Sequence, residues 1–277
     1  MSRLSIGKAW EEASSFLVRE IRLVTPVALA MFAVPATLMG WFNPGGQPAT
    51  APGGLGWPLT LIALIVTMIG QMSIAALAIG WSGSIGGVLA LAARRVWGLL
   101  GAVLLVFVPL TILTIIAVAV LIGSYGITDP GELTPQVLAA TPGMGVILIV
   151  LLLLFLFIGV RLFPVSAIAI TETSNPLKLL SRSWRLTRGH FLRLLAVLLL
   201  VVIAAMASSI AVTTVVGSLM ALVAGEAKPF SLSALITALA DGIIASAISA
   251  ISAALVGRIY VQLSASQATV PEVSLES

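Results

Sequence analysis

The sequence predicts an all-α fold, a polytopic membrane helix bundle of about six transmembrane helices. Of the 277 residues, 60% are hydrophobic and only 9% are charged, whereas soluble globular proteins carry roughly 25% charged residues. A water-soluble fold of this length could not bury so much apolar surface, so lipid must cover part of it. The apolar runs are continuous and rich in Leu and Ala, without the period-two alternation of a membrane β-barrel.

Six apolar runs are long enough to cross the hydrocarbon core, which requires about 20 helical residues. They are Leu23 to Phe42, Leu59 to Trp81, Trp97 to Gly123, Met144 to Ile170, Leu192 to Val223 and Leu232 to Leu263. The last two contain about 30 residues each, which is about 45 Å of helix. They must therefore tilt, kink or extend beyond the membrane. We expect residues 264–277 to form a disordered cytoplasmic tail.

The distribution of basic residues predicts the orientation of these spans. Segments 42–58, 124–143 and 225–231 contain Lys228 as their only basic residue. The segments on the other side carry Arg3, Lys8, Arg19, Arg22, Arg94, Arg95, Lys178, Arg182, Arg185, Arg188 and Arg193. Because basic loops stay on the cytoplasmic side, both termini are predicted to be cytoplasmic, with the protein in the bacterial inner membrane.

Two of the basic segments have the pattern of amphipathic helices lying on the membrane surface. Residues 1–22 place apolar side chains, including Ala9 and Phe16, on one face and charged side chains on the other. Residues 176–190 separate Leu177 and Leu180 from a basic face in the same way. The second segment is either an ordinary elbow before a span or a binding site for anionic lipid head groups. The candidate head-group residues are Lys178, Arg182, Trp184, Arg185, Arg188 and Arg193.

An approximate internal repeat links these surface segments to the spans. Similar stretches begin near residues 5, 84 and 178, and each leads from a surface segment into a spanning helix. This pattern predicts three repeats of one surface helix and two spans. The middle stretch, residues 84–96, lacks a polar face.

Polar and ionisable side chains within spans are costly and are candidates for function. Here they are Gln71, Arg161, Glu172, Asp241 and Arg258. One hypothesis is structural: Glu172 forms an ion pair with Arg161, Arg182 or Arg258 and locks helix ends together. The other is a substrate or proton pathway through Asp241 and Gln71. Asp241 and Arg161 lie about 14 Å and 26 Å from the outer ends of their spans, which argues against a direct pair.

The last span has small residues at regular spacing. Gly, Ser and Ala recur every four residues on two adjacent rows, which are Gly242, Ser246, Ala250 and Ala254, and Ala245, Ser249, Ala253 and Gly257. Such rows allow helix backbones to approach closely. We therefore expect this helix to pack tightly at the centre of the bundle rather than to line a pore.

The stretch from Arg161 to Leu195 carries a motif of a known family. Its matching positions are Arg161, Pro164, Glu172, Ser183, Trp184, Leu186, Thr187, Gly189, Phe191 and Arg193. The motif resembles that of the glycerophosphoryl diester phosphodiesterase membrane-domain family. The resemblance implies a six-helix bacterial inner-membrane protein. Some relatives carry a fused phosphodiesterase domain, which these 277 residues lack, so the resemblance implies no enzymatic activity.

The remaining composition bounds the function. The chain has no cysteine and one histidine, His190, so we expect no catalytic residues, no metal and no cofactor. The cations lie between apolar runs, which indicates membrane topology rather than nucleic-acid binding. We favour a non-catalytic module that binds or organises anionic lipids or other membrane proteins. The alternatives are a small transporter or lipid flippase with a site between repeats, and an enzyme acting on lipid head groups.

Overall fold

The structure, a computed structural model, describes residues 5–44, 56–125 and 143–268, and these are helical throughout apart from short connections. The helices are α1 (Ile6–Arg19), α2 (Ile21–Ala28), the π-helix η1 (Leu29–Ala33), α3 (Val34–Phe42), α4 (Gly56–Ile79), α5 (Ile85–Ser124), α7 (Met144–Leu162), α8 (Val165–Thr171), α9 (Pro176–Thr187), α10 (Phe191–Ala224) and α11 (Leu232–Ala268).

Six segments among these are long and apolar enough to cross a membrane. They are Ile21–Phe42, Gly56–Ile79, Ile85–Val120, Met144–Thr171, Phe191–Ala224 and Leu232–Ser266. Each overlaps one of the six predicted spans. The prediction of an all-α, polytopic membrane protein is therefore confirmed.

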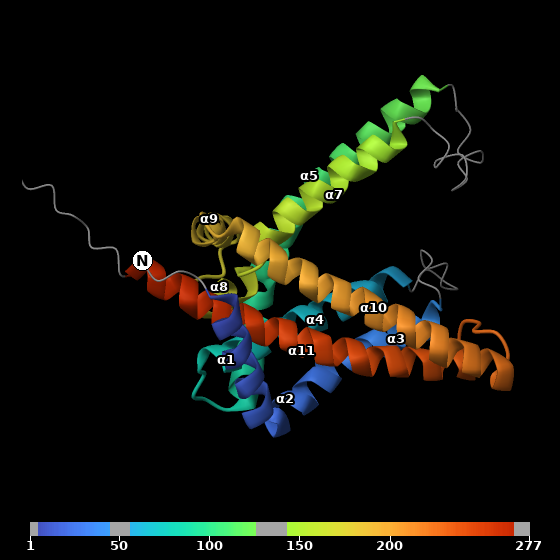
Figure 1. The fold of residues 1–277 in the computed structure, drawn as a ribbon, viewed down its shortest axis with the longest axis horizontal. Coiled ribbons are helices and arrows are strands. Elements are labelled where there is room, and N and C mark those ends of the chain that lie inside the picture. Colours follow the sequence, from blue (N-terminus) through green and yellow to red (C-terminus); the bar gives the residue numbers. More distant parts are fainter. Residues whose placement is uncertain (1–4, 45–55, 126–142, 269–277) are drawn as a thin grey trace, which may run out of the picture.

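The helices form two parts that diverge from a common end (Figure 1). In the first part, which we call the bundle, α11 packs against α3, α4 and α10. In the second, the arm, α5 and α7 run side by side away from the bundle. Helices α1, α8 and α9 lie where the two parts join, and we call this the basic end. The start of α1 and the last turns of α11 meet there, because the Ser5 amide donates to Gln262 Oε1 of α11 at 3.3 Å.

Small residues let α11 approach its neighbours at the centre of the bundle. A Cβ atom at Gly257 would lie 2.7 Å from the Ala75 carbonyl oxygen of α4. A Cβ atom at Gly242 would lie 2.6 Å from Thr37 Oγ1 of α3. Ser246, Ala250, Ala253 and Ala254 are buried on the same helix. The predicted tight packing of the last span is confirmed.

The first span is not a regular α-helix, which its apolar pattern did not indicate. Residues 29–33 form a π-helical turn, in which the Val34 amide donates to the Leu29 carbonyl five residues earlier. Pro35 follows directly and has no amide proton to donate, so the regular ladder is interrupted at this point. The turn joins α2 to α3, whose far end borders a cavity of the bundle.

Two predicted segment boundaries differ from the structure. The middle surface segment, residues 84–96, is not a separate helix, because α5 is one continuous helix of 40 residues. The three-repeat pattern therefore holds only for α1 and α9, which are separate short helices. The lack of a polar face in segment 84–96 is the physical reason, since nothing favours a turn onto the surface there. The predicted tail is helical up to Ala268, and residues 269–277 lie outside the described residues.

Candidate functional site

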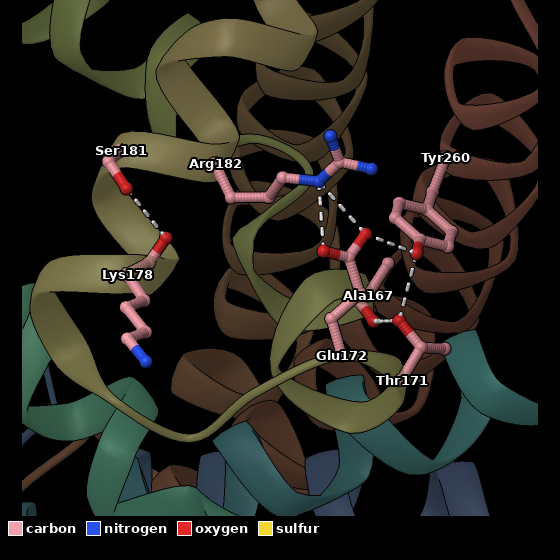
Figure 2. A network of polar contacts seen from close by, with 7 residues as sticks. All are labelled: Ala167, Thr171, Glu172, Lys178, Ser181, Arg182 and Tyr260. Atoms are coloured by element: carbon pink, nitrogen blue, oxygen red, sulfur yellow. Dashed lines mark hydrogen bonds and ion pairs between the residues drawn. The ribbon is translucent and has the colours of Figure 1, made fainter. Parts of the chain in front are cut away.

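A carboxylate at the basic end joins three helices (Figure 2). Glu172 directly follows α8, and Arg182 of α9 donates from Nε to its two oxygens at 2.8 and 3.1 Å. The Tyr260 hydroxyl of α11 donates to Glu172 Oε1 at 2.7 Å and lies 3.1 Å from the Thr171 hydroxyl. The predicted ion pair of Glu172 is confirmed, with Arg182 as the partner among the three candidates.

Arg161, at the end of α7, is held by aromatic rings and by α9. Its guanidinium lies 4.9 Å from the centre of the Trp184 ring and 5.4 Å from that of Phe157, which are cation–π distances. Its Nη1 donates to the Trp184 carbonyl at 3.2 Å and to Thr187 Oγ1 at 3.0 Å. Arg161 forms no ion pair with any carboxylate in the part of the chain that the structure describes. Its charge therefore fixes α9 on α7 without being neutralised.

Helix α9 shows three faces rather than the two that the sequence suggested. Asn175 caps its first turn by accepting from two backbone amides, and Pro176 follows. The face packed on the protein consists of Leu179, Ser183, Leu186 and Thr187. Leu177, predicted on the apolar face, and Trp184 border this packed face and remain 64% and 48% exposed. The predicted apolar face is thus only partly exposed: Leu180 packs against the core, while Leu177 and Trp184 are available to lipid.

The third face of α9 and the following turn are basic. Lys178, Arg185 and Arg188 are exposed, and the Lys178 side chain points away from the Glu172 cluster (Figure 2). Arg193, in the first turn of α10, is partly buried. Residues 172–193 contain five basic side chains and one acid, Glu172, which gives a net charge of +4.

The other intramembrane candidates lie at three different places in the bundle. Arg258 lies over the Phe16 ring of α1, 5.8 Å from its centre. Gln71 lines a cavity of about 310 Å³ where α4, α5, α7, α8, α10 and α11 meet. Asp241 lines a different cavity and does not contact Arg161, as the difference in depth predicted.

The Asp241 cavity lies between α3, α10 and α11 and has a volume of about 640 Å³. Its polar lining side chains are Asn43, Ser209, Thr213, Thr237 and Asp241. A transporter requires such a space between helices, so this cavity is compatible with that alternative. Transport itself stays a prediction.

Two residues of the basic end were missed as site residues by the sequence analysis. Arg95 of α5 donates from Nη1 to the Ala169 and Ile170 carbonyls at 3.1 and 2.9 Å. It thereby caps the end of α8, where carbonyls lack helical partners. Tyr260 lies in the last turns of the final span, where a tyrosine is ordinarily an interfacial anchor rather than a site residue. The residues that Arg95 and Tyr260 contact lie far from them in the sequence, so no local pattern indicates these contacts.

The fold and these polar clusters define a polytopic membrane protein with a basic end and a polar cavity. Compared with known protein families, residues 4–268 match the model described as "Domain of unknown function (DUF7847)". The chain therefore belongs to the DUF7847 family. No curated protein and no solved structure matches it. The resemblance to the glycerophosphoryl diester phosphodiesterase membrane domain stays a prediction.

Proposed function

We propose that this protein is a non-catalytic membrane module whose basic end binds anionic lipid head groups. The observation that carries the proposal is the net charge of +4 over residues 172–193. The only acid in that segment, Glu172, already accepts from Arg182 and Tyr260. The segment therefore carries an excess of positive charge, which attracts lipid phosphates, the anions at a membrane surface.

The geometry of α9 supports this proposal. Leu177 and Trp184 form an exposed apolar edge that can enter the interface between head groups and acyl chains. Lys178, Arg185 and Arg188 are exposed on the rest of the helix and the following turn, where they would contact lipid phosphates in this proposal. Arg161 adds an unneutralised charge directly behind Trp184.

The orientation and location form part of the same proposal. The start of α1 and the last turns of α11 lie at the basic end, and the rule that basic segments stay in the cytoplasm supports cytoplasmic termini. The resemblance of residues 161–195 to the glycerophosphoryl diester phosphodiesterase membrane-domain family, which stays a prediction, is the reason for proposing a bacterial inner membrane. That membrane would supply the anionic head groups, and other membrane proteins could be held through the same lipids.

Lipid retention provides the test. The full chain is reconstituted with equal amounts of phosphatidylglycerol and phosphatidylcholine and released for native mass spectrometry. We expect preferential retention of phosphatidylglycerol, reduced roughly a hundredfold in the triple variant Lys178→Gln, Arg185→Gln, Arg188→Gln, since each of the three cations near the surface contributes about 1 kcal/mol.

The matched control is Lys228→Gln, which removes a cation from the turn between α10 and α11 at the opposite end of the bundle. It should leave retention unchanged. Equal retention of both lipids by the unaltered protein, or undiminished phosphatidylglycerol retention by the triple variant, would contradict the proposal.

A further inference from the structure

The Asp241 cavity is built from one face of each of three helices. The lining positions recur at intervals of three and four residues, as they must on one face of a helix. They are Ala36, Met39, Gly40 and Asn43 of α3 with its end, Ser209, Thr213 and Gly217 of α10, and Ala234, Thr237, Ala238 and Asp241 of α11. The space is therefore a regular feature of the packing between these helices, kept open by small residues.

The cavity extends from the end of the bundle where α10 turns into α11 toward the middle of the bundle. Asn43, Pro44 and Ala227 lie at the ends of α3 and α10 and line its outer part. Asp241 lies nine residues after Leu232, the first residue of α11, which is about 14 Å along the helix. Thr213 is exposed whereas Ala234 and Ala238 are buried, so the cavity opens beside α10.

Two polar groups in the cavity lack partners in the structure. Asp241 forms no hydrogen bond or ion pair with any residue that the structure describes. The Thr237 hydroxyl oxygen, one turn away on α11, is buried and also has no partner there. A carboxylate within a membrane span is costly unless a cation accompanies it, and buried hydroxyl groups normally form hydrogen bonds.

From these observations we propose that the cavity binds a small organic cation with a single positive charge, whose ammonium group contacts Asp241. A volume of about 640 Å³ is within the range of small-molecule sites and far larger than a metal ion needs. One carboxylate balances one charge, while Ca²⁺ and Mg²⁺ prefer several charged oxygen ligands or retained waters. Met39, Ala36 and Ala234 supply apolar contacts for alkyl groups.

Aromatic side chains at the end of α3 make the mouth of this cavity rigid. The Trp41, Phe42 and Phe230 rings contact one another with centres 5.2 to 5.9 Å apart. The Phe230 amide donates to the Trp41 carbonyl at 3.1 Å, which ties the turn before α11 to the end of α3. The α3 and α11 walls are thus held at a fixed separation, so the site is preformed.

The proposal concerns binding and holds whether or not the cation crosses the membrane; it is also independent of the lipid site at the basic end. The test uses the full chain in lipid nanodiscs with three probes: choline, ethanolamine and 3,3-dimethylbutan-1-ol, the neutral isostere of choline. Binding is measured by thermal stabilisation and by isothermal titration. We expect saturable binding of at least one ammonium probe, and much weaker binding of the neutral alcohol.

Two variants test the carboxylate of Asp241 and the volume of the cavity separately. Asp241→Asn keeps the shape of the side chain and should weaken ammonium binding about tenfold or more, as expected for loss of a charge-assisted contact. Gly217→Leu keeps the carboxylate but fills the cavity, because a Cβ atom at Gly217 would lie 3.9 Å from Thr237 Cγ2, its nearest neighbour. It should abolish binding.

The control is Glu226→Gln, which removes an acid from the same end of the bundle without lining the cavity. It should bind like the unaltered protein. The proposal is overturned if neither ammonium probe binds, if the neutral alcohol binds equally well, or if Asp241→Asn and Gly217→Leu, both folded by size-exclusion chromatography, bind as strongly as Glu226→Gln.

Discussion

The bundle buries more of the surface of α11 than the arm buries of α5 and α7, although the helices of the arm are more apolar. The most apolar stretches of the spans that contain α5 and α7 are almost entirely unburied, whereas that of α11 in the bundle is less apolar and more buried. The face of α11 consists of Ala, Ser and Gly, while α7 carries a run of Leu, Ile, Val and Phe. Lipid tails are as apolar as these side chains, so small size rather than hydrophobicity selects helix contacts here.

The largest expected effect tests whether close backbone contact holds the bundle together. Gly257→Val should destabilise the protein by about 3 kcal/mol, because overpacked sites force backbone shifts. The new Cβ atom would lie 2.7 Å from the Ala75 carbonyl oxygen and 3.0 Å from the Ala78 Cβ. Thermal unfolding in detergent measures this effect.

The matched control lies in the arm. A Cβ atom at Gly145 of α7 would meet no other atom within 4 Å, so Gly145→Val should change stability by less than about 0.5 kcal/mol. If the two valine variants melt at the same temperature, the contrast between bundle and arm is wrong.

The spans were predictable because they depend on composition alone. The runs starting at Leu23, Met144 and Leu232 match observed helices within a few residues, since long apolar segments have only one stable arrangement in a membrane. The predicted start of the third span at Trp97 does not match the start of its helix, because α5 already begins at Ile85. Composition indicates which residues are apolar enough to span, but not where a helix continues beyond the membrane.

The candidate sites were predictable only in part. Glu172 and Asp241 stood out because ionisable residues in or near spans are rare. The partner of Glu172 could not be chosen from three arginines, and Tyr260 was missed, because their contacts depend on how α8, α9 and α11 meet. The cavity beside Asp241 requires three helix faces at once. Contacts between distant segments of this kind leave no local pattern in the sequence.

An intermediate effect is expected where the arm meets the bundle. Glu172→Gln should destabilise the protein by roughly 1–2 kcal/mol, because it removes a charge-assisted contact between partly exposed side chains. The Arg182 and Glu172 side chains are 22% and 31% exposed, so the loss should shrink at high salt. Chemical unfolding at low and high salt measures both effects.

Two variants locate the source of that effect. Tyr260→Phe keeps the ion pair and should cost about 1 kcal/mol for the lost hydrogen bond. Glu12→Gln breaks the more exposed pair with Lys8, whose atoms are 3.8 Å apart, and should cost less than about 0.5 kcal/mol. A Glu12→Gln effect equal to that of Glu172→Gln would mean that the Glu172 ion pair, where the arm meets the bundle, stabilises the protein no more than an exposed pair does.

The smallest expected effect lies on the outer face of the arm. Leu153 of α7 is 60% exposed, and Leu153→Ala in lipid nanodiscs should change the free energy of unfolding by less than about 0.5 kcal/mol, because lipid tails replace the lost contacts. Val150→Ala, at a position 55% exposed on the same helix, should behave alike. A cost of about 2 kcal/mol, typical of a packed core leucine, would instead mean that protein covers this face. A second copy of the chain would then be the first candidate to examine, and the arm would differ from the bundle only in packing against another molecule.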